Sequence, residues 1–275
     1  MASKGSDAPP ASIDVDRARA LETALAAARA AAGVHRAHRG RTPVAEWSTK
    51  ATSDFVTHVD RDAEAEALAV IRAAFPGHAV MAEEGAPDAV RSMSGALWIV
   101  DPLDGTTNYL HGYPEYCASV ALAVDGELIA GAVVASNGDE YVAARGTGAR
   151  RNGEPLAVSG IDRLELALIG TGFPFKALDR LPAYQRQFAR VLQSTSGVRR
   201  AGSAALDLCH VASGWFDGFW ELSLAPWDIA AGALIVAEAG GVVTRIEDGH
   251  LLDGGGYLAG NPSIHEQLGR LIRDA

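Results

Sequence analysis

The middle of the chain contains an apolar run that leads into a turn rich in aspartate and threonine, at residues 96–108 (ALWIVDPLDGTTN). Ala96–Val100 has the length and composition of a buried β-strand. Pro102 is expected to end that strand, because proline has no amide hydrogen to donate to a neighbour. Asp101 then lies at the strand end, and the turn presents residues 104–106 (DGT). Two carboxylates three residues apart suit a hard cation, since oxygen ligands favour Mg²⁺ or Mn²⁺ over zinc or copper.

The glycine of this motif and the amides that follow it suit an anion. Gly105 allows the backbone to approach closely, and the N–H groups of residues 105–107 could surround a phosphate as a helix N-terminus does. Taken alone, the motif is also compatible with a surface turn, because Asp, Pro and Gly are ordinary turn residues. An aspartyl-phosphate phosphatase is disfavoured. That class places two aspartates two residues apart on one strand, so that both side chains point at one phosphate. Here the two aspartates are three residues apart, and Pro102 lies between them.

Further segments surround this motif in a recognisable order. They are Lys50 with residues 54–60 (DFVTHVD), residues 81–85 (MAEEG), residues 170–176 (GTGFPFK) and residues 227–232 (WDIAAG). With the central motif they resemble the inositol monophosphatase family of Mg²⁺-dependent phosphomonoesterases, over about residues 15–270. The segment 170–176 is similar to that of bacterial members.

The resemblance implies a site for two or three Mg²⁺ ions, for which Mn²⁺ can substitute. Glu83, Asp101 and the Leu103 carbonyl would bind one ion, and Asp101, Asp104 and Asp228 a second. A third, weaker ion would share Glu83. Phosphate-ester hydrolysis with two metal ions needs carboxylates that converge from separate elements, and these residues meet that need. Asp228 is also compatible with a first-turn acid at a helix start, and Glu83 with a solvated acid.

The resemblance also implies catalytic and substrate-binding residues. Thr106, hydrogen-bonded to Asp60, would orient the attacking water, and Lys50 would balance charge near it, beside the catalytic Glu83. From the residues alone, Asp60 is also compatible with a helix cap. The substrate would contact Asp104, Gly105, Thr106, Gly202, Ser203, Ala204 and Glu221.

The rest of the pattern predicts an α+β fold. Helices are expected at 12–37 (with Ser12 as N-cap), 60–75, 181–193, 203–212, 226–239 and 262–272, and strands at 79–82, 96–100, 117–124, 127–135, 140–144, 164–170, 215–220, 242–245 and 257–259. Residues 41–53 are expected to form a loop. Turns at Asp125-Gly126, Asn137-Gly138 and 151–154 predict antiparallel pairing in the N-terminal half. Strand–helix alternation predicts an α/β C-terminal half.

The resemblance implies that these elements form a layered αβαβα sugar-phosphatase fold. We expect a disordered tail at residues 1–11, an antiparallel-rich half with the metal site at 12–158, and a half that completes the site at 159–275. The histidines are expected to be structural or solvated: His35 and His38 solvated at the end of the first helix, His111 and His210 structural.

Charge and cysteine content limit the partners and the compartment. The net charge of −10 argues against nucleic acid or an anionic membrane as the main partner. Cys117 and Cys209 form no motif and are expected to be buried free thiols in a reducing compartment. No signal peptide is visible, and the apolar stretches are too short or interrupted to span a membrane. A soluble cytoplasmic protein is expected.

We therefore expect a Mg²⁺-dependent phosphomonoesterase that hydrolyses inositol monophosphate or a related small polyol or sugar phosphate. Fructose 1,6-bisphosphate, histidinol phosphate and the 2′-phosphate of NADP are alternative substrates within the family, and Glu221 favours a polyol. The resemblance further implies lithium sensitivity and a homodimer. The alternative from another class is a non-enzymatic accessory factor of the transcription machinery, as some bacterial relatives are. The acidic charge and the complete ligand set disfavour it as the sole role.

Overall fold

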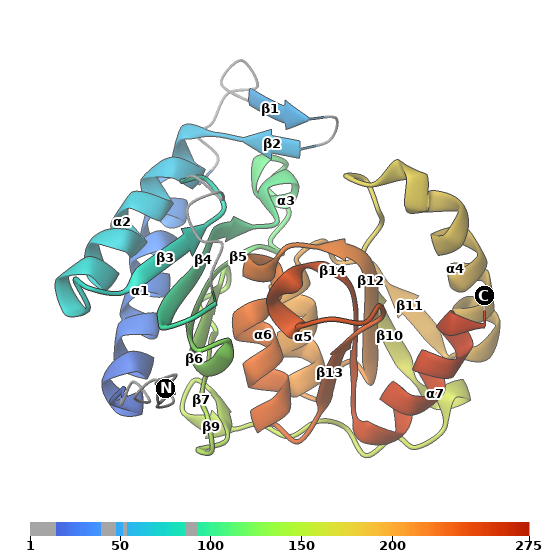
Figure 1. The fold of residues 1–275 in the computed structure, drawn as a ribbon. Coiled ribbons are helices and arrows are strands. Elements are labelled where there is room, and N and C mark those ends of the chain that lie inside the picture. The colour runs from blue at the N-terminus through green and yellow to red at the C-terminus, as the bar shows by residue number, and fades with distance from the viewer. Residues whose placement is uncertain (1–14, 40–47, 52–53, 86–92, 275) are drawn as a thin grey trace, which may run out of the picture.

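The structure, a computed structural model, describes residues 15–39, 48–51, 54–85 and 93–274, which form alternating layers of helix and sheet (Figure 1). For residues 48–51 and 54–56 only the backbone is described. Across the view of Figure 1 the layers are a helix pair, a sheet, a second helix pair, a second sheet and a third helix pair. The expected α+β fold with αβαβα layering is therefore confirmed.

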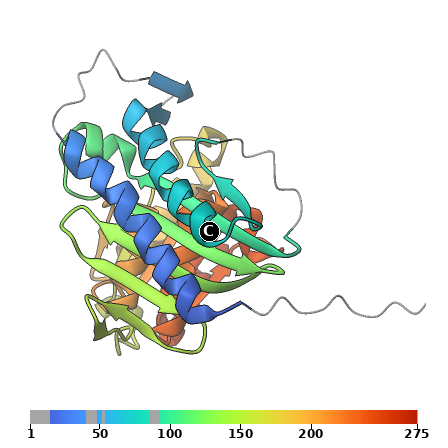
Figure 2. The ribbon, with the colours of Figure 1, turned by 90° about the vertical axis from the view of Figure 1, so that its left-hand side faces the viewer.

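The first sheet has seven strands in the order β3-β4-β5-β6-β7-β8-β9. Its strands are β3 (Ala79–Ala82), β4 (Ala96–Asp104), β5 (Cys117–Val124), β6 (Glu127–Ala135), β7 (Glu140–Ala144), β8 (Ala149–Arg151) and β9 (Glu154–Pro155). Only β3 and β4 pair in parallel, and the other neighbours are antiparallel. Helices α1 (Arg17–His38) and α2 (His58–Ala74) lie across one face of this sheet (Figure 2).

The second sheet has five strands in the order β11-β10-β12-β14-β13. Its strands are β10 (Leu168–Thr171), β11 (Gly197–Arg199), β12 (Gly218–Leu224), β13 (Val242–Arg245) and β14 (Gly255–Gly260). Helices α5 (Ala204–Ala212) and α6 (Pro226–Glu238) fill the space between the two sheets, and α4 (Leu181–Ser194) and α7 (Pro262–Arg273) cover the outer face (Figure 1). The described part also contains the pair β1 (Ser48–Ala51) and β2 (Asp54–Val56) and the short helix α3 (Thr106–Leu110).

Strand β4 shows why apolar and polar residues do not alternate in the central apolar run. Leu97 and Ile99 pack into the core between the sheets, whereas Trp98 and Val100 pack into the core under α1 and α2. Both faces of the strand are buried, so both faces need apolar side chains. The same burial fixes the position of Asp101, which follows this apolar run within β4.

The prediction that Pro102 ends this strand is wrong, because β4 continues to Asp104. Asp101 pairs with Ser119 and Asp104 with Cys117, so three steps along β4 match two along β5. This unequal number of residues on the two strands is that of a β-bulge. A proline in a bulge costs no hydrogen bond of the sheet. The bulge brings Asp101 and Asp104 to the same edge of the sheet.

Other differences from the predicted elements are local. β1 lies within the segment expected to be a loop, and the three-residue strand β11 was not predicted. A 3₁₀ turn at Leu164–Leu166 replaces the start of the strand expected at 164–170, and β12 begins at Gly218 rather than at 215. The expected N-cap Ser12 and the tail 1–11 lie outside the described residues, and Asp16 caps α1. No helix in the described residues is long and apolar enough to cross a bilayer.

The prediction of a solvated His35 is also wrong. The side chain is 2% exposed, and its Nε2 lies 2.8 Å from the carbonyl oxygen of Pro102. The rings of Tyr109 and Tyr116 lie 6.0 and 5.9 Å away, centroid to centroid. Because a carbonyl can only accept, Nε2 carries the hydrogen. Burial lowers the pKa of His35 to about 4. His35 therefore supports the bulge that carries the acidic motif.

This burial predicts a pH-dependent stability. Between about pH 6.5 and 4 the unfolded chain takes up a proton on His35 that the folded chain does not, so stability falls as the pH falls through this window. The shift corresponds to roughly 3 kcal/mol. His35→Gln keeps an N–H donor but does not titrate, so its stability should depend less on pH by about that amount. Urea unfolding of both proteins from pH 7.5 to 4 measures the difference, and parallel curves would contradict it.

Candidate active site

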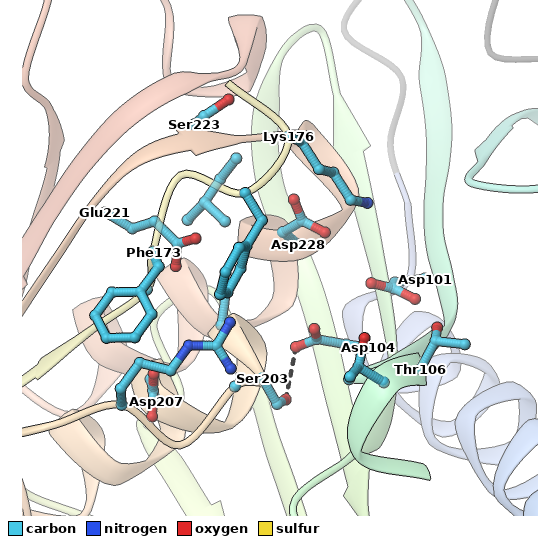
Figure 3. A pocket seen from close by; sticks show the side chains of 18 of the residues that line it. Asp101, Asp104, Thr106, Phe173, Lys176, Ser203, Asp207, Glu221, Ser223 and Asp228 are labelled. Carbon is cyan, nitrogen blue, oxygen red and sulfur yellow. Dashed lines mark hydrogen bonds between the residues drawn. The ribbon is translucent and has the colours of Figure 1, made fainter. Parts of the chain in front are cut away.

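Three aspartates meet at the edge of the first sheet that faces the second. Asp101, Asp104 and Asp228 each offer a carboxylate oxygen, and these oxygens lie within 4.8 Å of one another. They come from the end of β4 and from the first turn of α6, segments more than a hundred residues apart in the chain. Figure 3 shows all three facing one cavity of about 430 Å³ between the two halves of the chain. No other group of three or more such side chains occurs in the part of the chain that is described.

Each aspartate is held by the backbone around it. Asp101 is 1% exposed and its Oδ1 accepts a hydrogen bond of 3.0 Å from the Leu103 amide. Asp104 Oδ2 accepts from the Ser203 hydroxyl at 2.6 Å and from the Ala205 amide at 2.8 Å, which joins β4 to the start of α5 (Figure 3). Asp228 Oδ2 accepts from the Ala225 amide at 2.7 Å. Asp228 is thus a helix-capping acid and also a member of the group.

Burial raises the pKa values of all three aspartates, and neighbouring acids add to the shift for Asp101 and Asp228. Burial and the charges of Glu83, Asp104 and Asp228 raise the pKa of Asp101 well above its usual range. Burial and the charges of Asp104 and Glu83 raise the pKa of Asp228 to about 8. Burial also raises the pKa of Asp104, although the Ser203 hydroxyl and Ala205 amide oppose the shift. The group repels its own negative charge, which a bound cation would relieve.

Glu83 lies beside this group but is not part of it. It follows β3, and its amide donates to the Val100 carbonyl at 3.2 Å, so that the parallel strands deliver Glu83 and Asp101 to one edge. Its Oε1 lies 3.9 Å from Nζ of Lys176, which the sequence analysis did not single out. In Figure 3 the Lys176 amine points into the cavity toward the aspartates.

Thr106 and Asp60 meet as expected. Thr106 Oγ1 lies 3.1 Å from Asp60 Oδ1 and 3.1 Å from the Leu103 carbonyl oxygen. The other oxygen of Asp60 accepts from the amide and hydroxyl of Thr57, at 2.8 and 2.6 Å. Asp60 is therefore both the capping-box acid of α2, whose N-cap is Thr57, and the partner of Thr106. The side chain of Lys50 lies outside the described residues.

Gly105 fits its position because only glycine can occupy it. Its φ is +94°, a left-handed conformation, and a Cβ there would lie 2.9 Å from the carbonyl oxygen of Glu115 and 3.2 Å from Cβ of Tyr116. Asn108 then ties the motif to the second half of the chain, because its Nδ2 donates to the carbonyls of Glu115 and Ala201 at 2.7 and 2.9 Å.

The opposite end of the cavity is formed by the second sheet. Glu221 and Ser223, two residues apart on β12, both line it, as do Gly202, Ser203 and Ala204 from the segment that begins α5. A methyl group at Gly172 would overlap the Glu221 carboxylate, so this glycine makes room for that side chain. Burial and the charge of Asp228 raise the pKa of Glu221 to about 8.

Several cavity residues were missed by the sequence analysis. They are Phe173, Phe175, Lys176, Arg200, Asp207 and Ser223. The guanidinium of Arg200 lies over the rings of Phe173 and Phe175, 5.5 and 5.4 Å from their centroids. Lys176 ends the segment 170–176, which resembles the family, so its place in the cavity could have been predicted. Ser223 lies two residues after Glu221, so it could have been predicted to share its face of a strand. No signal in the sequence indicated Asp207 or Arg200.

The donor set fits a hard divalent cation. The clustered ligand atoms are carboxylate oxygens, and the described part of the cavity contributes neither histidine nor cysteine to its lining. Positive charge lies nearby on Lys176 and Arg200, which suits a substrate with a negative group. The three aspartates can hold cations, and the Thr106 hydroxyl, which is hydrogen-bonded to Asp60, can position a water molecule.

Comparisons with known proteins agree on one family. The family model for the inositol monophosphatase family matches residues 16–275. The Nus factor SuhB of Pseudomonas aeruginosa is 44% identical over 254 residues, which cover 90% of this chain and 93% of that protein. An inositol-1-monophosphatase of Mesorhizobium japonicum is 42% identical over 229 residues, with 82% and 85% covered. The solved structure of the extragenic suppressor protein suhB from Bartonella henselae has a TM-score of 0.85 at 37% identity and covers 93% of this chain and 99% of that one.

Proposed function

The chain belongs to the inositol monophosphatase family, and from that premise we propose that it is a Mg²⁺-dependent phosphomonoesterase for inositol monophosphate or a related small polyol phosphate. The observation that carries the proposal is the group of Asp101, Asp104 and Asp228 in a cavity that also contains Thr106. The family is metal-dependent, and this acidic group is able to bind a metal.

The ions would be held by the residues expected from the sequence. Glu83, Asp101 and the Leu103 carbonyl would hold one Mg²⁺, and Asp101, Asp104 and Asp228 another, with Mn²⁺ as a substitute. When bound, such ions neutralise the phosphate, activate water and stabilise the leaving oxygen. Lithium inhibition is expected on the same premise.

The residues of the chain itself would position the water and the phosphate. Two donors from Thr57 occupy Asp60 Oδ2, which leaves Oδ1 for the Thr106 hydroxyl. Thr106 can therefore donate to Asp60 while its oxygen accepts from the attacking water, so the water is oriented and its proton has an acceptor nearby. The amides of residues 105–107 would bind the phosphate oxygens, and Lys50 would balance charge near the water.

The leaving group would lie toward Glu221 and the segment Gly202–Ala204. A carboxylate at that place accepts hydrogen bonds from hydroxyls, which favours a polyol. Fructose 1,6-bisphosphate, histidinol phosphate and the 2′-phosphate of NADP are the alternatives within the family. Phosphate release from inositol 1-phosphate and from these three esters, with Mg²⁺, tests the proposal. Preferred release from inositol 1-phosphate supports it, and release from none of them would refute it.

A second candidate comes from the relatives named Nus factor SuhB. Their similarity favours a role as an accessory factor of the transcription machinery, with or without catalysis. A pull-down of transcription proteins, done with the wild type and with a catalytically impaired Asp101→Asn variant, separates the roles. Capture by both proteins together with phosphate release by the wild type alone would show two separate functions.

Glu221→Gln is expected to reduce the recognition of a polyol phosphate selectively. The amide replaces one acceptor oxygen with a donor, and a lost hydrogen bond is worth about tenfold in KM. p-Nitrophenyl phosphate has no hydroxyls on its leaving group, so its KM should change less than twofold. Steady-state kinetics with inositol 1-phosphate and p-nitrophenyl phosphate measure both.

Gly172→Ala provides an independent check on the position of Glu221. The added methyl group would displace the Glu221 carboxylate without changing any charge. The same selective rise in KM is therefore expected. Equal losses on the two substrates, in either variant, would mean that Glu221 is structural or acts on the metal ligands.

A further inference from the structure

Asp207 is a buried acid that the proposed chemistry does not use. It lies on α5 one turn after Ser203, and its amide donates to the Ser203 carbonyl at 2.9 Å. The residue is 1% exposed and lines the same cavity as the three aspartates. Figure 3 shows it on the side of Glu221 and Phe173, away from Asp101 and Thr106. It therefore lies at the end of the cavity where the leaving group would be.

Its carboxyl is not satisfied within the protein. Oδ1 of Asp207 has no hydrogen-bond partner among the described residues, and no ion pair joins it to Arg200. Asp217 provides the contrast: it is 6% exposed, and its two oxygens accept from the Ser159 hydroxyl and the Leu168 amide at 2.5 and 2.6 Å. A buried polar atom without a partner costs free energy. Because Asp207 also lines the cavity, a ligand bound there would be placed to supply a partner that the described residues do not.

Charge adds to this cost. Burial and the charges of Glu221, Asp104 and Glu115 raise the pKa of Asp207 well above its usual range. The charge of Glu221 on β12 therefore acts on Asp207 on α5, and both residues line this cavity. Two carboxyl groups that face one space match a group with two or more neighbouring hydroxyls, because each hydroxyl both donates and accepts.

We propose that Asp207 is a second specificity-determining residue, which with Glu221 hydrogen-bonds neighbouring hydroxyls of the ester's leaving group. The inference rests on the proposed function, and it names the substrate class more closely: a phosphate ester whose leaving group carries at least two adjacent hydroxyls on the side away from the phosphate. An ester with a plain aromatic leaving group leaves Asp207 unpaired.

The test uses two non-hydrolysable ligands, inositol 1-phosphonate and phenylphosphonate, titrated calorimetrically in Mg²⁺. Asp207→Leu keeps the number of heavy atoms but can neither donate nor accept. It should weaken the binding of inositol 1-phosphonate about tenfold or more, and that of phenylphosphonate less than twofold. Asp207→Asn should recover a large part of the loss, because an amide both donates and accepts. The melting temperature of Asp207→Leu should not fall, because the variant removes an unpaired buried group.

Asp217→Asn is the matched control for a structural role. Its amide keeps one acceptor oxygen in place of two, so it loses one of the two satisfied hydrogen bonds. It should therefore lower the melting temperature and leave the ratio of the two affinities as in the wild type. Equal weakening of both phosphonates by Asp207→Leu, or wild-type affinity for both, would overturn the inference. Hydrolysis is measured separately. If the wild type hydrolyses no ester but the selective loss is found, the proposed function fails and the role of Asp207 stands.

Discussion

Thr106→Ala is expected to lower kcat by about 10²–10⁴-fold, the range for a positioned group that handles a proton. The hydroxyl lies 3.1 Å from Asp60 Oδ1, and Asp60 keeps its two bonds from Thr57 in the variant. The metal carboxylates are untouched, so KM should change little. The substitution therefore removes only the group that would hold the attacking water.

Thr106→Ser is the matched variant, because it keeps the hydroxyl and loses only the methyl group. It should retain most of the wild-type kcat. Single-turnover and steady-state phosphate release with inositol 1-phosphate and saturating Mg²⁺ measure the two variants. A wild-type kcat in Thr106→Ala would show that the hydroxyl only stabilises the turn after β4.

Mg²⁺ is expected to reverse the order of stability of the wild type and the Asp101→Asn variant. Without metal, burial and three neighbouring acids raise the pKa of Asp101. A folded-state pKa above the unfolded one means that stability falls as the pH rises above the unfolded pKa, so at neutral pH this carboxyl makes the metal-free fold less stable than it is in acid. The variant removes this titratable group, and its amide oxygen can still accept from the Leu103 amide. Without metal it should melt no lower than the wild type.

With Mg²⁺ the order should change. Binding to the folded state contributes RT ln(1 + [L]/Kd), about 2.7 kcal/mol at a hundredfold excess over Kd. Asp101 is the only side chain proposed to contact both ions, so the variant should lose most of this gain. Thermal melts in EDTA and in Mg²⁺ measure the shift, and Asp62→Asn on the exposed side of α2 controls for the change in net charge. An equal Mg²⁺-induced shift in all three proteins would refute the bridging role.

Locally encoded features were predicted well from the sequence. Asp125-Gly126 and Asn152-Gly153 both adopt positive φ angles, as their hairpins require. The two strands beside Asp125-Gly126, β5 and β6, begin and end where expected. β13 was predicted to the residue. In each case the signal lies within a few neighbouring residues, so no distant contact is needed to interpret it.

Features that depend on distant contacts were missed. The continuation of β4 past Pro102 is decided by its pairing with β5, and the burial of His35 by contacts with residues some 70 positions away. The acids of the candidate site could be named from their motifs, but not the separation of Glu83 from the other three or its pairing with Lys176. Asp207 gave no signal, because an unpaired oxygen can be recognised only once the surrounding side chains are placed.

The central claim is that the three clustered aspartates form a magnesium-dependent centre for phosphate-ester hydrolysis. The most direct test is phosphate release from inositol 1-phosphate by protein stripped with EDTA, as Mg²⁺ is added back, for the wild type and Asp101→Asn. We predict no release without metal, recovery in the wild type as Mg²⁺ is restored, and no recovery in the variant. Full release in metal-free buffer, or the same recovery in both proteins, would contradict the assignment.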